Sequence, residues 1–345
     1  MKPLQMPMFS PETEWIPPTH LPDLKDHKEI AIDLETRDPG LKSSGSGSVN
    51  GNGEVVGIAV AVEGWSGYFP IAHEGGGNMD RALVLDWFEE VLHTDATKIF
   101  HNAMYDVSWI RSMGFYIRGG VIDTLIAASL IDENRWGYAL NALGKQYVGV
   151  GKNEKILNDA AKSWGIDPKA DMWRLPAPLV GEYAEQDAVL TLKLWHALQR
   201  EISSQDLWDV FNLETNLFPC LIDMKFKGVR VDAEKANLLK QELIKEEKNI
   251  YRGIRKLIGF DVEIWAAASI AKAFDEVKLP YDRTEKGAPS FTKNFLSTHP
   301  HELPKAIANA REINKAHTTF IDTIIKHEHN GRIHADINQI RSDDG

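Results

Sequence analysis

Two acidic residues interrupt an apolar stretch near the start of the chain, in the sequence IAIDLETR at residues 30–37. The neighbouring Ile, Ala and Leu residues predict a buried strand, in which Asp33 and Glu35 leave the same face. At about 4 Å and an effective dielectric constant near 20, two like charges repel by roughly 4 kcal/mol. The pair therefore needs a cation or raised pKa values, unless the strand ends here and water solvates both carboxylates.

Two further acids extend this pattern along the chain. Asp106 lies in the first turn of an expected helix, four residues after Asn102, which can cap that helix. Tyr183 and Asp187 are spaced i and i+4 on another expected helix, so they share a face. Each feature is common by itself, since a first-turn Asp often just balances the helix dipole. The informative signal is the ordered set D-x-E, N-x-x-x-D and Y-x-x-x-D.

This ordered set resembles the three motifs of the DEDD superfamily of 3′→5′ exonucleases, and the tyrosine fits its tyrosine branch. The stretches GYFPIAHEG, KIFHNAMYDVSWI and VIDTLIAASLI are similar to the proofreading domain of family A DNA polymerases, the DNA polymerase I family. Later stretches resemble the start of the polymerase domain in that family, its thumb and the entry to its palm: LETNLFPCLIDMKFKGVRVD, TEKGAPSFTKNFL, AREINKAHTTFIDTI and GRIHADINQ. The resemblance covers residues 29–340.

The resemblance implies two divalent cations, Mg²⁺ or Mn²⁺, which prefer carboxylate oxygens as ligands. We expect Asp33, Glu35 and Asp187 to hold the first ion, and Asp33 with Asp106 to hold the second. Tyr183 would orient the attacking water. Paired ions stabilise both the attacking and the leaving oxygen of such a displacement. Hydrolysis at a 3′ end would then release a nucleoside 5′-monophosphate.

The expected substrate is DNA with a single-stranded or frayed 3′ end. The 3′ end must leave the duplex to reach such a site, and each lost stacking step costs about 1.4 kcal/mol. A mismatched end frays at less cost, so it reaches the site more easily, which implies proofreading. Asn102 either contacts the terminal nucleotide or serves only as the helix cap. His101 and Asp123 are expected to be structural. Two other candidate substrate contacts are Thr36 and Leu41, although Leu41 is a poor positional match to the wedge leucine of the family.

The chain pattern predicts an α/β fold, a ribonuclease H-like exonuclease domain with a mixed central sheet and flanking helices. Strand-like segments at 29–36, 54–64 and 66–75 predict a three-stranded meander, and the Gly/Ser-rich insert at 41–54 predicts a flexible loop. We expect an N-terminal arm over 1–28 and the exonuclease domain over 29–204. Residues 205–345 should form a mainly helical, thumb-like domain with a truncated start of the polymerase domain.

A long amphipathic helix is expected at 232–259 in this second domain. Its Lys and Arg side chains either contact duplex phosphates, as a thumb does, or form a solvated face.

The bulk composition is that of a globular protein, with 43% hydrophobic and 26% charged residues among 345. No apolar stretch approaches the length of a membrane span, and the Pro-rich start is not a signal peptide. Cys220 is the single cysteine, which excludes a disulfide framework and a cysteine zinc site. We therefore expect no membrane partner and a cytoplasmic location, in a bacterium or a phage-infected cell. The net charge of −11 argues against simple polyanion binding, but its acidic excess lies mainly in the first domain.

The two aspartates that hold the polymerase metals in this family, and its basic fingers helix, have no counterpart before Gly345. We expect no polymerisation from this chain alone. It is then either an N-terminal fragment or an exonuclease subunit with a separate polymerase chain in trans. Two alternatives remain open: an RNA 3′-processing exonuclease similar to ribonuclease D, and a non-catalytic module that binds DNA or anchors a polymerase.

Overall fold

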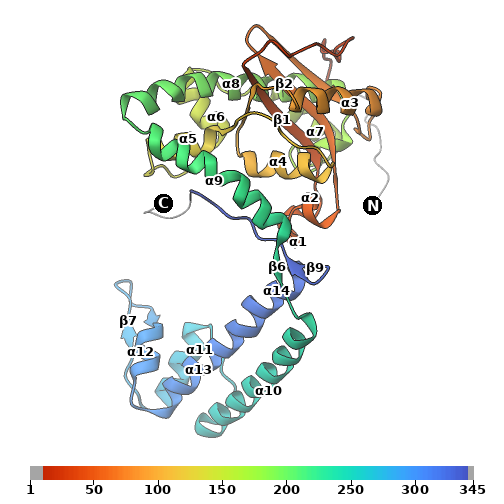
Figure 1. Ribbon diagram of the computed structural model, residues 1–345. Coiled ribbons are helices and arrows are strands. Elements are labelled where there is room, and N and C mark those ends of the chain that lie inside the picture. Colours follow the sequence, from red (N-terminus) through yellow and green to blue (C-terminus); the bar gives the residue numbers. More distant parts are fainter. Residues whose placement is uncertain (1–10, 341–345) are drawn as a thin grey trace. The chain divides into compact units, whose positions relative to one another are not determined.

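The structure is a computed structural model that describes residues 11–340 (Figure 1). The chain divides into two compact units. Within the described residues, the first comprises 11–227 together with 335–340, and the second is Gly228–His334. The division lies after the helix that we expected to open the second domain, so the compact units do not follow the expected boundary at 204/205. Each unit is described by itself.

A mixed five-stranded sheet forms the centre of the first unit, with the strand order β3-β2-β1-β4-β5. The meander that the sequence predicted is present, since β1 pairs antiparallel with β2 and β2 with β3. The two remaining strands run parallel to β1. The strands are β1 (Glu29–Arg37), β2 (Glu54–Val62), β3 (Trp65–Pro70), β4 (Thr97–Phe100) and β5 (Val121–Asp123). This mixed sheet with flanking helices confirms the predicted α/β class.

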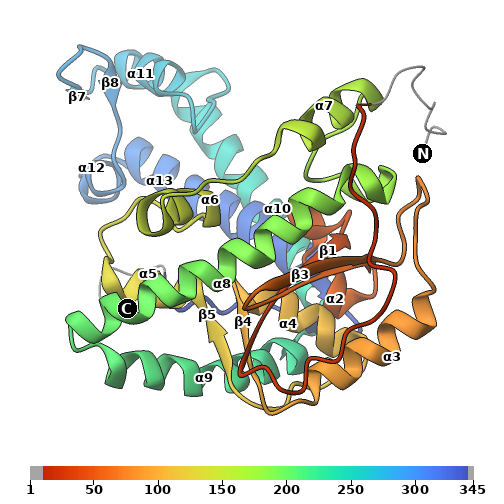
Figure 2. The same cartoon turned by 90° about the horizontal axis from the view of Figure 1, so that it is seen from above.

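The two faces of the sheet carry separate apolar clusters. On one face Ala31, Ala59 and Ile99 pack under the long helix α8 (Gly181–Ser204), which crosses β1, β2 and β3 (Figure 2). The other face, with Ile30 and Ile32, packs against α3 (Arg81–Leu92) and α4 (Ala103–Ser112). Because side chains alternate along a strand, the odd-numbered residues of β1 point toward α8. Asp33 and Glu35 therefore lie on the α8 face, as their spacing predicted.

The strand β1 continues past the end of its neighbour β4. Only Glu29, Ile30 and Ala31 pair with β4, because β4 stops at Phe100 and the chain turns into α4. The second half of β1 thus has an open edge on this side, next to the first turns of α4. Such a break beside a parallel pair is where α/β sheets commonly place a ligand site.

The insert at 41–54 is more ordered than the flexible loop that its composition predicted. It forms two short helices, α1 (Leu41–Ser44) and α2 (Gly47–Asn50). The Asp38 carboxylate accepts the Gly47 N–H at 3.0 Å. A Cβ at Gly47 or Gly53 would lie within 2.9 Å of the Trp109 ring. Glycine is used here for close packing on α4, so composition alone was a poor guide to flexibility.

Short helices connect the sheet to α8, and the chain leaves α8 through α9 (Trp208–Lys227). Residues 140–148 form a helical turn that continues as a π-helix. The connecting elements are α5 (Thr124–Ile131), α6 (Leu140–Leu143), η1 (Gly144–Val148), α7 (Lys155–Trp164), η2 (Met172–Arg174) and η3 (Ala177–Leu179).

The second unit is mainly helical, with α10 (Ala233–Ile258) packed on α13 (Glu302–Lys315). Its core gathers around Phe274, which is fully buried. A polar contact joins the long helices, because the Glu247 carboxylate accepts hydrogen bonds from His317 at 2.7 Å and Asn314 at 2.9 Å. The other elements are β6 (Val229–Arg230), α11 (Ala267–Glu276), β7 (Asp282–Arg283), β8 (Pro289–Ser290), α12 (Lys293–Thr298), η4 (Ala316–Ile321), α14 (Asp322–His327), β9 (Glu328–His329) and β10 (Arg332–Ile333). None of the helices within residues 11–340 is both long enough and apolar enough for a membrane crossing.

The N-terminus of α4 is capped by a residue from another element. Asn102 occupies the N-cap position as predicted, but its side chain makes no capping bond and its φ is +71°. The Asp123 carboxylate, at the end of β5, accepts the N–H groups of Asn102 at 2.9 Å and Ala103 at 2.8 Å. It also accepts the Leu125 N–H at 2.9 Å, so one half-buried carboxylate caps both α4 and α5. The structural role expected for Asp123 is this double cap.

We predict that Asp123→Ala destabilises the fold by more than about 2 kcal/mol, because it leaves three N–H groups near the core without an acceptor. Asp80→Ala is the matched control, since Asp80 caps α3 through two N–H groups at an exposed position. That variant should lose about 1 kcal/mol. Urea unfolding of both proteins checks this, and equal losses would contradict the double-cap assignment.

Candidate active site

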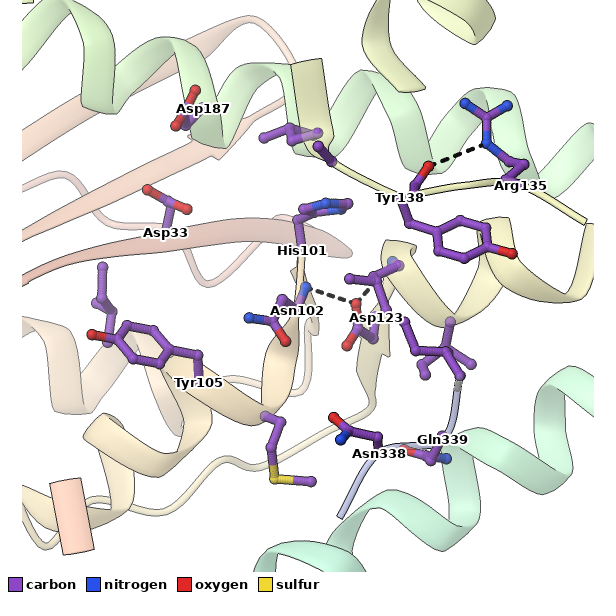
Figure 3. Close-up of a pocket in the computed structure, with 18 of the residues that line it drawn as sticks. Asp33, His101, Asn102, Tyr105, Asp123, Arg135, Tyr138, Asp187, Asn338 and Gln339 are labelled. Atoms are coloured by element: carbon purple, nitrogen blue, oxygen red, sulfur yellow. Dashed lines mark hydrogen bonds between the residues drawn. The ribbon is translucent and has the colours of Figure 1, made fainter. Parts of the chain in front are cut away.

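A cavity of about 950 Å³ opens where β1 runs past the end of β4 (Figure 3). Four of the residues predicted from the sequence as catalytic line it: Asp33 and Glu35 from β1, and Tyr183 and Asp187 from α8. Figure 3 shows Asp33 and Asp187 at one side of the cavity and Arg135 at the opposite side. Residues far apart in sequence thus contribute carboxylates to one hollow.

A β-bulge lies at the acid pair, because the pairing of β1 with β2 shifts between Glu35 and Thr36. Opposite Glu35 stands Gly57, where a Cβ would lie 1.9 Å from the Tyr68 hydroxyl oxygen. Only glycine leaves room for the Tyr68 ring at this place. Bulges of this kind re-aim side chains next to functional sites.

The Tyr68 hydroxyl is held in turn by His73. The Tyr68 Oη lies 2.6 Å from His73 Nε2, and His73 Nδ1 lies 3.0 Å from the Leu175 carbonyl oxygen. Burial lowers the pKa of His73 to about 4, so the ring is neutral near pH 7. A neutral ring that donates from Nδ1 to the carbonyl must accept the Tyr68 proton at Nε2. This fixes the Tyr68 ring against Gly57, the residue opposite Glu35.

Asp106 reaches the acid pair from the opposite face of the sheet. It is buried in the first turn of α4, as predicted, and its Oδ1 accepts the backbone N–H of Leu34 at 3.0 Å. Leu34 lies between Asp33 and Glu35 on the open edge of β1. The bond therefore fixes the position of α4 against the acid-bearing strand, although Asp106 itself does not line the cavity.

A lysine that the sequence analysis did not single out also contacts these acids. The Lys152 Nζ lies 2.5 Å from Asp187 Oδ2 and 3.4 Å from the Tyr183 hydroxyl. It stands 5.2 Å from the centre of the Tyr183 ring. No short motif marks Lys152, since it follows a Gly-rich turn that is 35 residues before Asp187. Only the packing of this turn against α8 reveals it.

Burial and the charges of neighbouring acids raise the pKa values of three of these four carboxylates. Burial, and then the charge of Asp187, raise the pKa of Asp33 to about 7, whereas Lys152 lowers it. Burial and the charges of Asp33, Asp187 and Asp106 raise the pKa of Glu35 well above its usual range. Burial and the charge of Asp33 likewise raise the pKa of Asp106. Keeping all four acids ionised therefore costs free energy that a bound cation would offset.

The chemistry of this donor set fits an oxygen-preferring divalent cation. One polar atom supports the fit: Asp187 Oδ1 is buried and has no hydrogen-bond partner. Across residues 11–340, however, no group of three or more Asp, Glu, His or Cys side chains is arranged to hold a metal ion. The Asp187 carboxylate faces Lys152 instead. The predicted ligand set thus requires side-chain rearrangement before it can surround an ion.

The three candidate substrate contacts lie in different surroundings. Asn102 lines the cavity, and its side chain is free of the capping role. The Thr36 hydroxyl makes a 2.6 Å hydrogen bond with the hydroxyl of Tyr105, which lines the cavity. Leu41 begins α1, is 41% exposed and is not among the described residues that line the cavity. Asn102 is thus the candidate with direct access.

Cationic and aromatic side chains also line this cavity. They come from the segment between α5 and α6 and from the loop after α7: Arg135, Trp136 and Lys169. Trp136 is fully exposed, at 107% of its reference area. The sequence analysis did not single these residues out. Positive charge and an exposed indole are features that suit a nucleic acid strand.

Comparisons with known proteins agree on one family. A family model described as a 3′-5′ exonuclease, of the A-type DNA polymerases, matches residues 17–203. A DNA-directed DNA polymerase of Pseudomonas phage M6 is 35% identical over 98% of this chain and 53% of the relative. The DNA polymerase DpoZ of Salmonella phage PMBT28 is 29% identical, covering 94% of this chain and 52% of that protein.

DNA polymerase I of Pseudomonas aeruginosa is 27% identical over 92% of this chain and 35% of its own length. This chain spans about half the length of the phage relatives. Among solved structures, the polymerase domain of Pol1 from M. smegmatis, in complex with DNA primer-template and dNTP, aligns with a TM-score of 0.70. It covers 92% of this chain and 50% of that one at 16% identity, which shows a common fold.

We predict that Asp33→Asn raises the free energy of unfolding in EDTA by at least about 1 kcal/mol at pH 8. Each unit by which folding raises the pKa of Asp33 costs the ionised wild-type protein about 1.4 kcal/mol. The folded Asp33 keeps its proton up to about pH 7, whereas the unfolded residue ionises near 3.8. Wild-type stability therefore declines as the pH rises through this window, and the neutral variant escapes that loss.

Thermal unfolding at pH 4, 6 and 8 measures this gain, which should grow with pH. The matched control is Asp159→Asn, at an exposed position on α7, which should show no such growth. A pH-independent gain for Asp33→Asn would contradict mutual repulsion in the site.

Proposed function

Because this chain belongs to the family of 3′-5′ exonuclease domains of A-type DNA polymerases, we propose that it is a metal-dependent exonuclease acting on DNA 3′ ends. Each cycle would release one nucleoside 5′-monophosphate. The observation that carries the proposal is the meeting of Asp33, Glu35, Asp106 and Asp187 at the open edge of β1. These acids come from three elements, and the charges of neighbouring acids raise the pKa values of Asp33, Glu35 and Asp106, which favours a cation-binding role.

We propose that Asp33, Glu35 and Asp187 hold one divalent cation and that Asp33 with Asp106 hold a second, Mg²⁺ or Mn²⁺. Two such ions, when bound, lower the barrier to attack by water and stabilise the departing 3′-oxygen. The acids themselves contribute fixed positions: two on a strand held by a bulge, and Asp106 on a helix bonded to Leu34.

Tyr183 is proposed to orient the attacking water. Burial and three neighbouring carboxylates raise the pKa of its hydroxyl, so this group remains a hydrogen-bond donor near pH 7. In the reaction, the water oxygen forms a bond to the terminal phosphorus and the bond from phosphorus to the 3′-oxygen breaks. The shortened strand retains a 3′-hydroxyl, and the phosphate leaves with the terminal nucleotide.

The proposed substrate is the single-stranded or frayed 3′ end of DNA, and the proposed biological role is proofreading. The DNA polymerases that this chain resembles support DNA over RNA as the substrate. We propose that polymerisation requires the other half of these relatives, joined to this chain or acting as a separate chain. Residues 205–345 would correspond to the thumb and the start of the polymerase domain.

Trp136 is proposed as the surface on which a base of the strand stacks. Its indole is fully exposed and lines the cavity with Arg135 and Lys169, whose charges complement phosphates. Stacking on an aromatic side chain does not depend on the base, as a proofreading exonuclease requires.

We predict that Asp187→Ala and Asp33→Ala abolish Mg²⁺-dependent release of mononucleotides from a 5′-labelled single-stranded DNA, while circular dichroism stays native. Tyr183→Phe should retain partial activity, because it removes one hydroxyl and leaves all four acids. Asp159→Ala controls for loss of an exposed acid. Full activity of Asp187→Ala would refute the site, and faster cleavage of an RNA of the same sequence would favour the ribonuclease D-like alternative.

We predict that Trp136→Ala weakens binding of oligo(dT) by roughly 5- to 150-fold, since stacking on an aromatic side chain contributes about 1–3 kcal/mol per base. Trp136→Phe should keep most of the affinity. Fluorescence anisotropy in an Asp187→Ala background avoids turnover. Tyr116→Ala is the matched control, because Tyr116 is 73% exposed and does not line the cavity. Equal affinities for the Trp136→Ala and Tyr116→Ala proteins would exclude this contact.

A further inference from the structure

Lys152 supplies a positive charge to the acid site from a loop that joins η1 to α7. Its ammonium group pairs with Asp187 at 2.5 Å, and both side chains are nearly buried, at 12% and 5% exposure. An ion pair so well shielded from water is screened far less than one on the surface. The contact therefore couples the loop strongly to the acids.

Two side chains fix the Lys152 backbone in place. The Lys152 N–H donates to Asn141 Oδ1 of α6 at 3.0 Å. On α8, Gln186 accepts the Asn153 N–H at 2.7 Å and donates to the Gly151 carbonyl at 3.3 Å. Gln186 directly precedes Asp187, so the same turn of α8 holds both the loop and the carboxylate.

Gly151 is required for this fit, since a Cβ there would lie 2.8 Å from Asn141 Oδ1. The loop is thus closely packed next to the site, and the long Lys152 side chain is the part that can move. A lysine side chain has several rotatable bonds, so its ammonium group can leave Asp187 while the loop stays in place.

The charge of Lys152 acts on more than one acid. It lowers the pKa values of Asp33, Glu35 and Asp187, against the effect of their burial. One monovalent cation thus serves several carboxylates, which is the electrostatic role that a divalent ion fills in such a site. A divalent ion bound to either oxygen of Asp187 would lie close to the ammonium group, so repulsion between the two positive charges disfavours their binding together.

We propose that Lys152 is a built-in counter-ion of the acid site, which stabilises the metal-free protein and competes with the divalent cation for Asp187. The proposal rests on the proposed function, because it concerns loading of the same site. Lys152 is a positioning residue in this view. It raises the metal concentration at which the site fills, and binding of the ion releases its ammonium group toward the cavity. By linkage, the factor by which metal binding weakens the contact of Lys152 with Asp187 equals the factor by which loss of that contact raises the affinity for the metal.

The test is a titration of the intact chain with Mn²⁺ in the absence of DNA, followed by calorimetry and by thermal unfolding. Lys152→Met should unfold at a lower temperature than wild type in EDTA and bind Mn²⁺ about fivefold or more tightly. Lys152→Arg, which keeps the charge, should stay closer to wild type. Lys152→Gln is a second neutral variant, with a hydrogen-bond donor, should the methionine protein fail to fold.

Lys155→Met is the matched control, because Lys155 begins α7 at an exposed position and its removal changes the net charge equally. It should leave Mn²⁺ affinity near that of wild type. Unchanged or weaker Mn²⁺ binding by both neutral Lys152 variants would overturn the counter-ion role and leave the proposed function standing. A wild-type protein without any Mn²⁺ response would overturn both.

Discussion

Repulsion among buried carboxylates is the constraint on which the organisation of the first unit depends. Asp33 and Glu35 share one face of β1, and Asp106 and Asp187 approach from helices on opposite sides of the sheet. The charge of at least one other acid raises the pKa values of Asp33, Glu35 and Asp106, and burial raises that of Asp187, so none of them is ionised without cost. Such an arrangement works against folding and is tolerated where it serves a site. The surrounding structure holds the acids close in spite of this repulsion.

The means of holding them are spread over the whole unit. The open edge of β1 is bound by Asp106 through the Leu34 N–H, and α4 is begun by Asp123 from β5. Tyr68, fixed by His73, packs against Gly57, the residue opposite Glu35. On α8, Glu185 accepts the Tyr68 N–H at 3.1 Å, which ties the helix that carries Asp187 to the sheet. Each contact joins elements that are distant in sequence, so the site forms only when the sheet and both helices have packed.

The regions that match known proteins coincide with the elements that carry the proposed site. The family match over residues 17–203 covers the sheet, α4 and α8, which are the elements that carry the acids. Similarity to much longer DNA polymerases extends through the second unit, where helices dominate. The division after Lys227 places α9 with the exonuclease unit, because Phe218 and Ile222 of α9 pack in the same apolar cluster as β1 and α4. Sequence resemblance alone assigned that helix to the following domain.

The amino-acid sequence by itself determined the α/β class, the meander and the shared face of Asp33 and Glu35, and its motifs marked the acids that we propose as metal ligands. These features depend on periodicities of two and 3.6 residues and on short motifs, which act within a few residues of the chain. The tertiary structure decided which distant groups meet. Lys152 reaches Asp187, and Asp123 replaces Asn102 as the cap of α4, because loops and strand ends from separate parts of the chain pack together there. The Gly/Ser insert became helical for the same reason, since its glycines fit against Trp109. Contacts of this kind depend on packing in three dimensions, and no local pattern encodes them.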